Sequence, residues 1–194
     1  AGRAGVCGSD RSAEVRLPVG RRSAGGRGGG QRDGSMAEDD DFEAPMEPTM
    51  IPGNLDVVKQ YCQNPTNGRL EWIQAEIRKN NLNKGSDITD EMEDYLDNMD
   101  MNPMDEPGMV IHKTLGGKGD NFWNIFAEGK TFDRDVYDND VLSQVYHGVN
   151  DSNGFATVTV RFKFKNPETT KPFKLAYRVE LPNGDIIEND LLNA

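Results

Sequence analysis

The stretch FATVTVRFKFK, residues 155–165, alternates apolar and polar side chains along its whole length. Successive side chains of a β-strand point to opposite faces, so Val158 and Phe162 share one face with the other apolar residues. Arg161 and Lys163 lie on the opposite face. The β-branched and aromatic content also favours a strand. We therefore predict a strand here, whose apolar face must be buried by another part of the chain.

A second alternating run, residues 173–181, leads into the turn Pro-Asn-Gly at 182–184 and a third strand. A two-residue Asn-Gly loop would place an apolar side chain opposite a charge. A type I turn with Gly184 in the left-handed bulge position instead places Val179 opposite Ile187. Since a shift by one residue would lose this match, we predict the bulged hairpin.

Three strands with one apolar face need a cover to be stable. Residues 109–115 favour a further strand, and apolar spacing favours helices over 121–128 and 141–147. Short apolar runs fit both types of element, so strands at the latter two segments remain an alternative that would give a β-sandwich. The predicted fold class is α+β, with an antiparallel β-meander or sandwich-like C-terminal domain, residues 109–194, covered by short helices.

The composition indicates a chain that is only partly globular and strongly acidic. Of its 194 residues, 35% are hydrophobic, which is below the usual range for globular domains. The formal net charge is −11, and such a chain is a poor candidate for binding nucleic-acid phosphates or anionic membranes. Cys7 and Cys62 make no disulfide framework, which favours a cytoplasmic or nuclear protein. No apolar run approaches the roughly 20 residues that span a bilayer.

The N-terminal part divides into two segments of different composition. Residues 1–35 carry seven Arg and many Gly, and three interpretations remain open: non-native upstream sequence, an organelle transit peptide or a native basic arm. Residues 36–54 combine acids with three prolines and are predicted to form a disordered acidic tail. We expect neither segment to contribute to the core.

Residues 55–108 are predicted to hold short helices followed by an acidic, Met-rich linker. Apolar residues at helical spacing favour helices over 55–62 and 69–79. A third helix is predicted to begin after Thr89, whose side chain can accept a hydrogen bond from the first turn, and to run through Met99.

The third helix combines an almost wholly acidic polar face with an apolar stripe that includes Met92, Tyr95 and Met99. Like charges at helical spacing weaken it in isolation. A stripe rich in methionine can adapt to the groove of a partner protein. The alternative is that the stripe packs against the β-rich domain of the same chain.

The predicted meander also gathers basic residues on its polar face. An acidic partner or an anionic ligand could bind there, although outward lysines also protect a sheet from edge-to-edge pairing. The predicted partner-binding residues are therefore Arg161, Lys163, Lys165 and Lys174 on the sheet, and Met92, Tyr95 and Met99 on the third helix.

The loop Gly-Gly-Lys-Gly at 116–119 lies between a predicted strand and a predicted helix, which is the order found in phosphate-binding loops. Its spacing matches neither the P-loop nor the dinucleotide-binding pattern. Asp120 would also place a negative charge where the phosphate should lie. The sequence therefore favours an ordinary turn.

No pattern indicates a metal site, a cofactor or catalytic residues. Four aspartates lie within residues 133–140, but the Gly that an EF-hand requires at its sixth position is replaced by Asp138. We interpret this segment as a solvated loop with a helix cap. His112 and His147 are the only histidines, and with two cysteines they make a structural zinc site an unfavoured interpretation.

With no catalytic pattern, we predict a non-enzymatic protein-interaction module, a subunit or adaptor of a larger complex, with other proteins as partners. A second hypothesis is a β-domain that holds a small hydrophobic ligand in an internal cavity. A third is an enzyme that uses the carboxylates of residues 133–140. Nucleic acid is not expected as a partner. The expected location is the cytoplasm or nucleus, or an organelle if residues 1–35 are a transit peptide.

Overall fold

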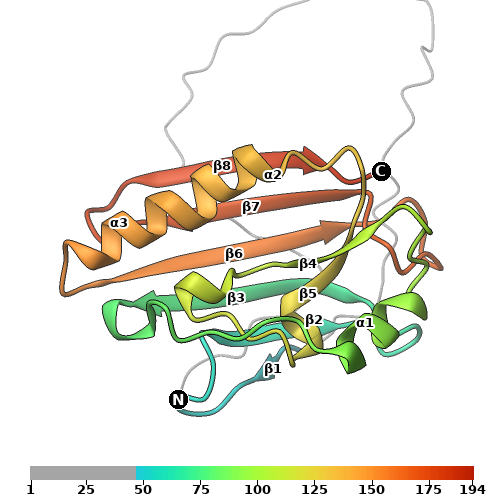
Figure 1. Ribbon diagram of the computed structural model, residues 1–194, viewed down its shortest axis with the longest axis horizontal. Helices are drawn as coiled ribbons and strands as arrows, with labels where there is room; N and C mark the ends of the chain where they lie inside the picture. The colour runs from blue at the N-terminus through green and yellow to red at the C-terminus, as the bar shows by residue number, and fades with distance from the viewer. Residues whose placement is uncertain (1–46) are drawn as a thin grey trace, which may run out of the picture.

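The computed structural model describes residues 47–194, so the predictions for residues 1–46 lie outside the described residues. Its main feature is a six-stranded sheet with the order β1-β2-β3-β6-β7-β8, in which every neighbouring pair is antiparallel (Figure 1). The strands of this sheet are β1 Thr49–Met50, β2 Val58–Gln63, β3 Leu70–Arg78, β6 Phe155–Lys163, β7 Lys174–Glu180 and β8 Ile186–Leu192.

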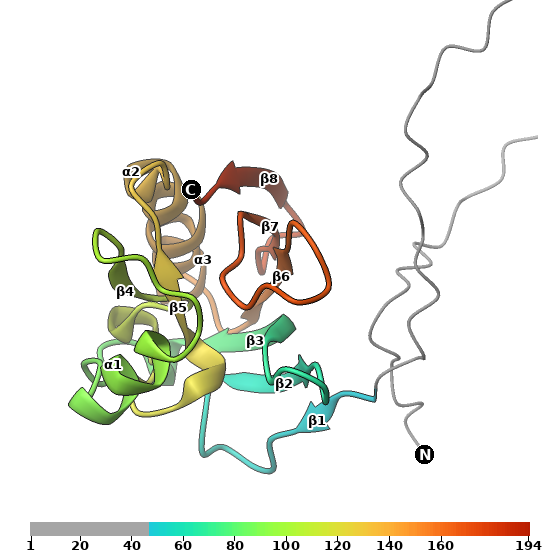
Figure 2. The same ribbon diagram turned by 90° about the vertical axis from the view of Figure 1, so that its right-hand side faces the viewer.

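A long connection between β3 and β6 supplies the cover. In Figure 2 its helices and its small β4–β5 sheet lie on one face of the main sheet. The elements of the connection are η1 Lys79–Asn81, α1 Asp90–Asp97, β4 Glu106–Met109, η2 Lys113–Leu115, η3 Phe122–Asn124, β5 Ile125–Glu128, α2 Arg134–Tyr137, η4 Asp138–Ser143 and α3 Gln144–Asn150. The predicted α+β class, an antiparallel sheet with a few short helices, is thus confirmed.

The meander has the predicted register. Val179 is paired with Val158 on one side and with Ile187 on the other. The backbone N–H of Leu181 donates to the carbonyl of Asp185 at 2.8 Å, as the bulged loop requires. Gly184 has φ +92°, the left-handed conformation predicted for it. The alternating pattern and the turn chemistry therefore determined this part of the fold together.

The core lies between the main sheet and the helical segment formed by α2, η4 and α3. Val158 and Val160 of β6 are fully buried, as predicted. They meet Val145 and Val149 of α3, which are also fully buried and belong to the same apolar cluster. Helix 141–147 is confirmed, because η4 and α3 cover this range. In residues 47–194, none of the helices combines the length and apolar character that crossing a bilayer requires.

The two helices predicted over 55–62 and 69–79 are wrong, because these segments form β2 and β3. In β3, Ile73, Ala75 and Ile77 are fully buried, which is a period of two. The small Ala75 hid this alternation, and the larger apolar residues fell by chance at helical spacing. Pairing of β3 with β2 and β6 decided the conformation.

Two predictions for the connection are also corrected. The strand expected over 109–115 ends at Met109 and is followed by a turn and the 3₁₀ helix η2. The helix expected over 121–128 is the 3₁₀ helix η3 followed by strand β5, so the strand alternative was right for its second half. Pairing of β4 with β5 supplies the backbone hydrogen bonds there.

Buried amide side chains bind parts of the connection to one another and to the chain that follows β8. Asn124 is fully buried; its Oδ1 accepts from the N–H of Ile111 at 2.8 Å, and its Nδ2 donates to the carbonyl of Ile111 at 2.9 Å and that of Lys118 at 3.2 Å. Asn193 is likewise fully buried, and its Nδ2 donates to the carbonyl of Ala127 at 2.9 Å. These amides satisfy backbone groups that have no ladder partner.

Candidate functional site

A polar pocket of about 560 Å³ lies where the β1–β2 loop, the end of β3 and the Gly116–Lys118 loop meet. Its charged side chains are unusual for so acidic a protein, since four of them are cationic and two are anionic. The charged lining residues are Lys59, Arg78, Lys84, Lys118, Asp56 and Glu76. The amides Asn54, Asn80 and Asn81 also line it.

Both carboxylates of the pocket are held by bonds within the protein. Asp56 is 5% exposed and accepts three hydrogen bonds, from Val58 N–H at 3.0 Å, Asn121 Nδ2 at 2.7 Å and Trp123 Nε1 at 3.1 Å. A buried carboxylate needs such donors, and here they fix the start of β2 against the connection.

The second carboxylate, Glu76, pairs with Arg78 on the same strand, with an N–O distance of 2.7 Å. These two carboxylates offset only part of the charge of the four cationic side chains that line the pocket. The charge that remains available to a ligand is positive.

The side-chain ammonium groups of two of the lysines have no hydrogen-bond or ion-pair partner within residues 47–194. Lys59 Nζ donates to the carbonyl of Asp56 at 2.7 Å, which keeps its ammonium at the pocket wall. The side-chain ammonium groups of Lys84 and Lys118, by contrast, make no hydrogen bond or ion pair within the described part of the chain. An ammonium without a partner can bind an anion without first breaking an internal bond.

Close backbone packing places Lys118 beside η1. A side-chain Cβ at Gly116 would lie 2.8 Å from the carbonyl oxygen of Asn81, and one at Gly117 would lie 1.7 Å from the carbonyl oxygen of Ile111. Gly116 also has φ +91°, which favours glycine. The glycines therefore permit the approach that brings this loop to the pocket.

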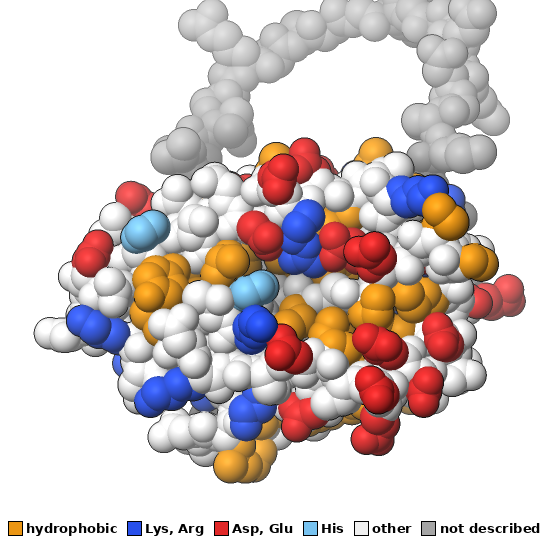
Figure 3. Space-filling model, viewed as in Figure 1, with side chains coloured by type: hydrophobic (Ala, Val, Ile, Leu, Met, Phe, Trp, Pro, Cys, Tyr) orange, Lys and Arg blue, Asp and Glu red, His pale blue; other side chains and the backbone are white. Residues whose placement is uncertain are grey.

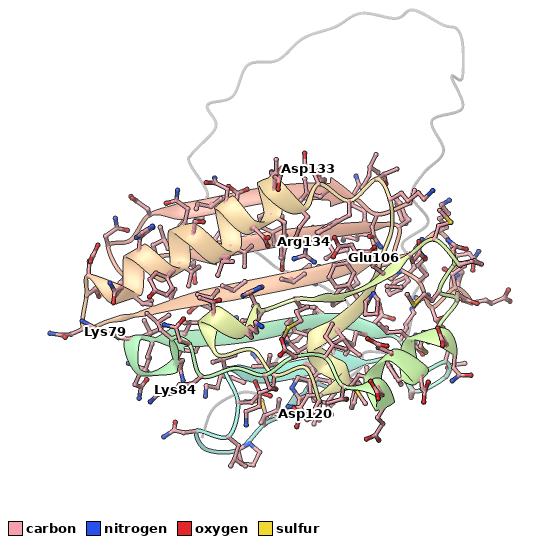
Figure 4. The ribbon with its side chains drawn as sticks, viewed as in Figure 1. Lys79, Lys84, Glu106, Asp120, Asp133 and Arg134 are labelled. Carbon is pink, nitrogen blue, oxygen red and sulfur yellow. The ribbon has the colours of Figure 1, made fainter. Side chains whose placement is uncertain are left out.

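Charge is separated across the face that carries the cover. Figure 3 shows Lys and Arg side chains gathered at its lower left and Asp and Glu side chains at its lower right, where Figure 1 places α1. Lys79 and Lys84 lie at the same end of the molecule in Figure 4. Residues 47–194 contain 25 acids and 15 Lys or Arg residues, so the basic end is a local departure from the overall charge.

Met92 and Tyr95 of the predicted apolar stripe lie on α1, which Thr89 caps by accepting from the N–H of Met92. The helix ends at Asp97 and does not reach Met99 as predicted. Met92 is buried in a small apolar cluster with Ile125, and the ring of Tyr95 lies 5.9 Å from that of Phe122. Burial raises the pKa of Tyr95 above its usual value. The stripe thus packs within the chain, and partner binding by Met92, Tyr95 and Met99 stays an untested prediction.

Of the predicted basic residues, Arg161, Lys163 and Lys174 lie on the open face of the sheet, but most of that face is of mixed charge. Lys174 pairs with Asp190 at 3.4 Å, and Arg178 pairs with Glu180 at 3.2 Å and also with Glu188. The hydrogen bonds that its guanidinium donates to Glu188 and Glu180 raise the pKa of Arg178.

Three further predicted residues lie on or next to this face. Lys163 and Lys165 are exposed, whereas Arg161 is half-buried and lines a shallow polar trough between the strands. The structure therefore brings Arg161, Lys163 and Lys174 onto one face without creating a uniformly basic surface, and it places Lys165 in the loop after β6.

Three of the four aspartates in residues 133–140 perform separate structural tasks. Asp133 caps α2 by accepting from Val136 N–H at 3.1 Å, Asp138 pairs with Arg134 at 3.2 Å, and Asp140 accepts from the Tyr177 hydroxyl at 2.7 Å. In residues 47–194, no group of three or more His, Cys, Asp or Glu side chains is placed to hold a metal ion.

An apolar hollow beneath α1 bears on the hydrophobic-ligand alternative. It is lined by Tyr95, Leu96, Met99 and neighbouring strand residues, and its volume is about 30 Å³. Small-molecule pockets are typically about 300 to 1,000 Å³. This hollow is therefore filled by the protein's own side chains and does not support that alternative.

Comparison with known proteins does not assign this chain to a family. Neither a family model nor a curated protein matches the chain. One solved structure, called an extracellular nuclease, shares 9% identity and a TM-score of 0.42 over 75% of this chain and 89% of its own. A likeness at this level carries no argument for nuclease activity here.

The predicted adaptor or subunit role is corrected. The solved structure reported above is named as a nuclease and not as an adaptor. The two features from which the role was inferred also have internal explanations, because the stripe of α1 packs within the chain and the basic sheet residues include paired ones such as Lys174 and Arg178.

Sequence reasoning missed the pocket because its cations come from distant segments. Lys59, Lys84 and Lys118 span about sixty positions, and no spacing rule connects them. The only local signal was the Gly-Gly-Lys-Gly loop, which was interpreted as an ordinary turn. Asp120, which argued against an anion there, is exposed and does not line the pocket.

Proposed function

We propose that this protein binds a phosphate-bearing anionic ligand in the basic pocket. The observation that carries the proposal is the pair of lysines, Lys84 and Lys118, that face the pocket without a partner in residues 47–194. Phosphate groups offer several acceptor oxygens, and ammonium groups form short, charge-assisted hydrogen bonds to them. The neighbouring amides of Asn54 and Asn80 supply further donors.

The size of the pocket supports a small ligand. A volume of about 560 Å³ lies within the usual range of small-molecule sites. Repulsion from the acidic remainder of the chain weakens long-range attraction, so affinity has to come from contacts inside the pocket. We therefore expect a compact ligand of high charge density.

We further propose binding without chemical turnover. Asp56 and Glu76 are the carboxylates of the pocket, and both already accept hydrogen bonds from protein donors. His112 does not line the pocket, and burial lowers its pKa. The side chains that could act as general bases are thus engaged or remote. A cytoplasmic or nuclear location stays a prediction, but the cysteines no longer support it, because Cys62 is disulfide-bonded.

Isothermal titration calorimetry of the full chain with myo-inositol hexakisphosphate and with inorganic phosphate tests the proposal. The double variant Lys84→Ala/Lys118→Ala should weaken binding at least about ten-fold, because each charge-assisted bond contributes on the order of 1 kcal/mol or more. The matched control Lys163→Ala/Lys165→Ala removes two exposed lysines, one at the end of β6 and one in the loop after it, and should leave affinity unchanged. Equal affinity of both variants would overturn the proposal.

A further inference from the structure

We infer that the ligand is the headgroup of an anionic phospholipid, so that the basic pocket docks the protein on a membrane surface with Leu55 inserted among the lipids. This inference rests on the proposed function and names the source of its phosphate. It adds an apolar contact that a soluble phosphate compound would not use. Three features of the same corner of the molecule carry it.

The first feature is the exposure of Leu55 at the rim of the pocket. Leu55 is 70% exposed, the highest fraction of any large apolar side chain in residues 47–194. It lies in the β1–β2 loop beside exposed Pro52 and next to the pocket-lining Asn54. A single exposed leucine needs no explanation by itself, but this one stands beside the unpaired lysines of the pocket.

The second feature is a further exposed apolar side chain at this corner, the ring of Phe155. Phe155 begins β6, is 43% exposed and is the strand partner of Arg78. The Arg78 guanidinium lies 4.5 Å from the centre of the Phe155 ring. Because Arg78 also lines the pocket, cationic and apolar side chains are continuous there. Surfaces that lie in the membrane interface combine these two types of side chain.

The third feature is the direction of the charge separation. Lys79 and Lys84 project at the basic end of the molecule (Figure 4), whereas α1 presents acids at the other end of the face shown in Figure 3. When the basic end meets an anionic bilayer, the acids of α1 lie farther away and are screened within about 8–10 Å by salt. The net charge alone would have argued against membranes, but its distribution favours this orientation.

An anionic bilayer fits these features better than a nucleic acid does. Both offer phosphates to Lys84 and Lys118. A duplex has no apolar layer that would accept Leu55, whereas the boundary between headgroups and acyl chains does. Each lysine near an anionic leaflet strengthens partitioning about five-fold, so the corner can bind reversibly without a membrane-spanning segment.

Vesicle co-sedimentation of the full chain tests the inference. The probes are vesicles of phosphatidylcholine alone, and of phosphatidylcholine with about 30% phosphatidylserine, a charge like that of an anionic leaflet. We expect binding to the anionic vesicles only, and a loss of about ten-fold or more for Leu55→Ser, since burial of a leucine side chain is worth about that factor. The matched control is Leu192→Ser on β8, which removes an apolar side chain that is 57% exposed and should bind like the wild type.

The outcomes separate this inference from the proposed function. If Leu55→Ser binds vesicles as the wild type does, or if a short DNA duplex competes the protein off the vesicles while Leu55→Ser leaves duplex binding intact, the membrane inference is wrong. Leu55→Ser should keep the affinity of the wild type for myo-inositol hexakisphosphate. If the wild type binds that compound but no vesicles, only the membrane inference fails. If it binds neither, the proposed function fails as well.

Discussion

The meander of β6, β7 and β8 and the long connection between β3 and β6 are stabilised by different means. The meander relies on alternating apolar residues and a turn of defined chemistry, so that Val158, Val179 and Ile187 align across three strands. The connection relies on individual polar contacts, such as those of Asn124 and Asp56. The difference teaches that a repeated pattern tolerates local change, whereas a set of unique contacts does not.

The largest effect is expected in the meander, when its pattern is broken by a charge. Val158 is fully buried, and Val158→Asp would bury an unpaired carboxylate at a cost on the order of 5 kcal/mol, enough to unfold an ordinary domain. Val158→Ile should cost less than about 3 kcal/mol, the usual range for overpacking. Urea denaturation followed by circular dichroism measures both. A stable, cooperative fold for Val158→Asp would contradict the burial of this face.

In the connection, the loss of one amide should already be costly. Asn124→Ala leaves the buried N–H and carbonyl of Ile111 without side-chain partners, and we expect a loss of about 2–4 kcal/mol in the free energy of unfolding. The control Asn153→Ala removes an exposed amide and should change stability by no more than about 0.5 kcal/mol. Similar values for the two variants would show that the hydrogen bonds of the Asn124 side chain do not stabilise the connection.

Two glycines test the same comparison on a smaller scale. A Cβ at Gly117 meets the carbonyl oxygen of Ile111 at 1.7 Å, so Gly117→Ala must displace the loop that carries Lys118. Gly184→Ala in the meander meets open space and should cost only about 1 kcal/mol, through its left-handed backbone. Of these two variants, we expect only Gly117→Ala to weaken phosphate binding, and calorimetry can measure this. Unchanged binding would show that the loop position does not matter.

The smallest effect is a pH dependence that belongs to the connection. Burial lowers the pKa of His112 below 6.5, its value in the unfolded chain. The unfolded state therefore binds more protons just below pH 6.5, so stability is complete above that pH and is lost as the pH falls toward the folded pKa. Thermal unfolding between about pH 5 and 7 should show this slope. His112→Gln should flatten it, and an unchanged slope would assign it to other groups.

The same comparison explains how much of the fold followed from the sequence. The meander, its register and α1 could be predicted because their signals are local: alternation, a Pro-Asn-Gly turn and the Thr89 cap. Strands β2 and β3 were missed because Ala75 weakened the alternation and pairing with distant strands decided their conformation. Strand β5 was predicted only as an alternative to a helix, because its pairing with β4 is likewise not encoded in its own spacing.

The candidate site was less accessible to sequence reasoning than the fold. Lys59, Lys84 and Lys118 meet only after β2, η1 and the glycine loop have packed together. The fact that Asp56 is already satisfied by Asn121 and Trp123 also depends on tertiary structure. Net charge misled the prediction, because a total says nothing about where the unpaired lysines lie.

The most direct test of the account is an NMR titration of the full chain with myo-inositol hexakisphosphate. We predict saturable shifts of the backbone amides of Gly116, Gly117, Lys118 and Lys84, with one binding constant for all of them. The amides of Lys163 and Lys165 should not move. Shifts that appear around Lys163 and Lys165 while Gly116–Lys118 stays unchanged would contradict the account.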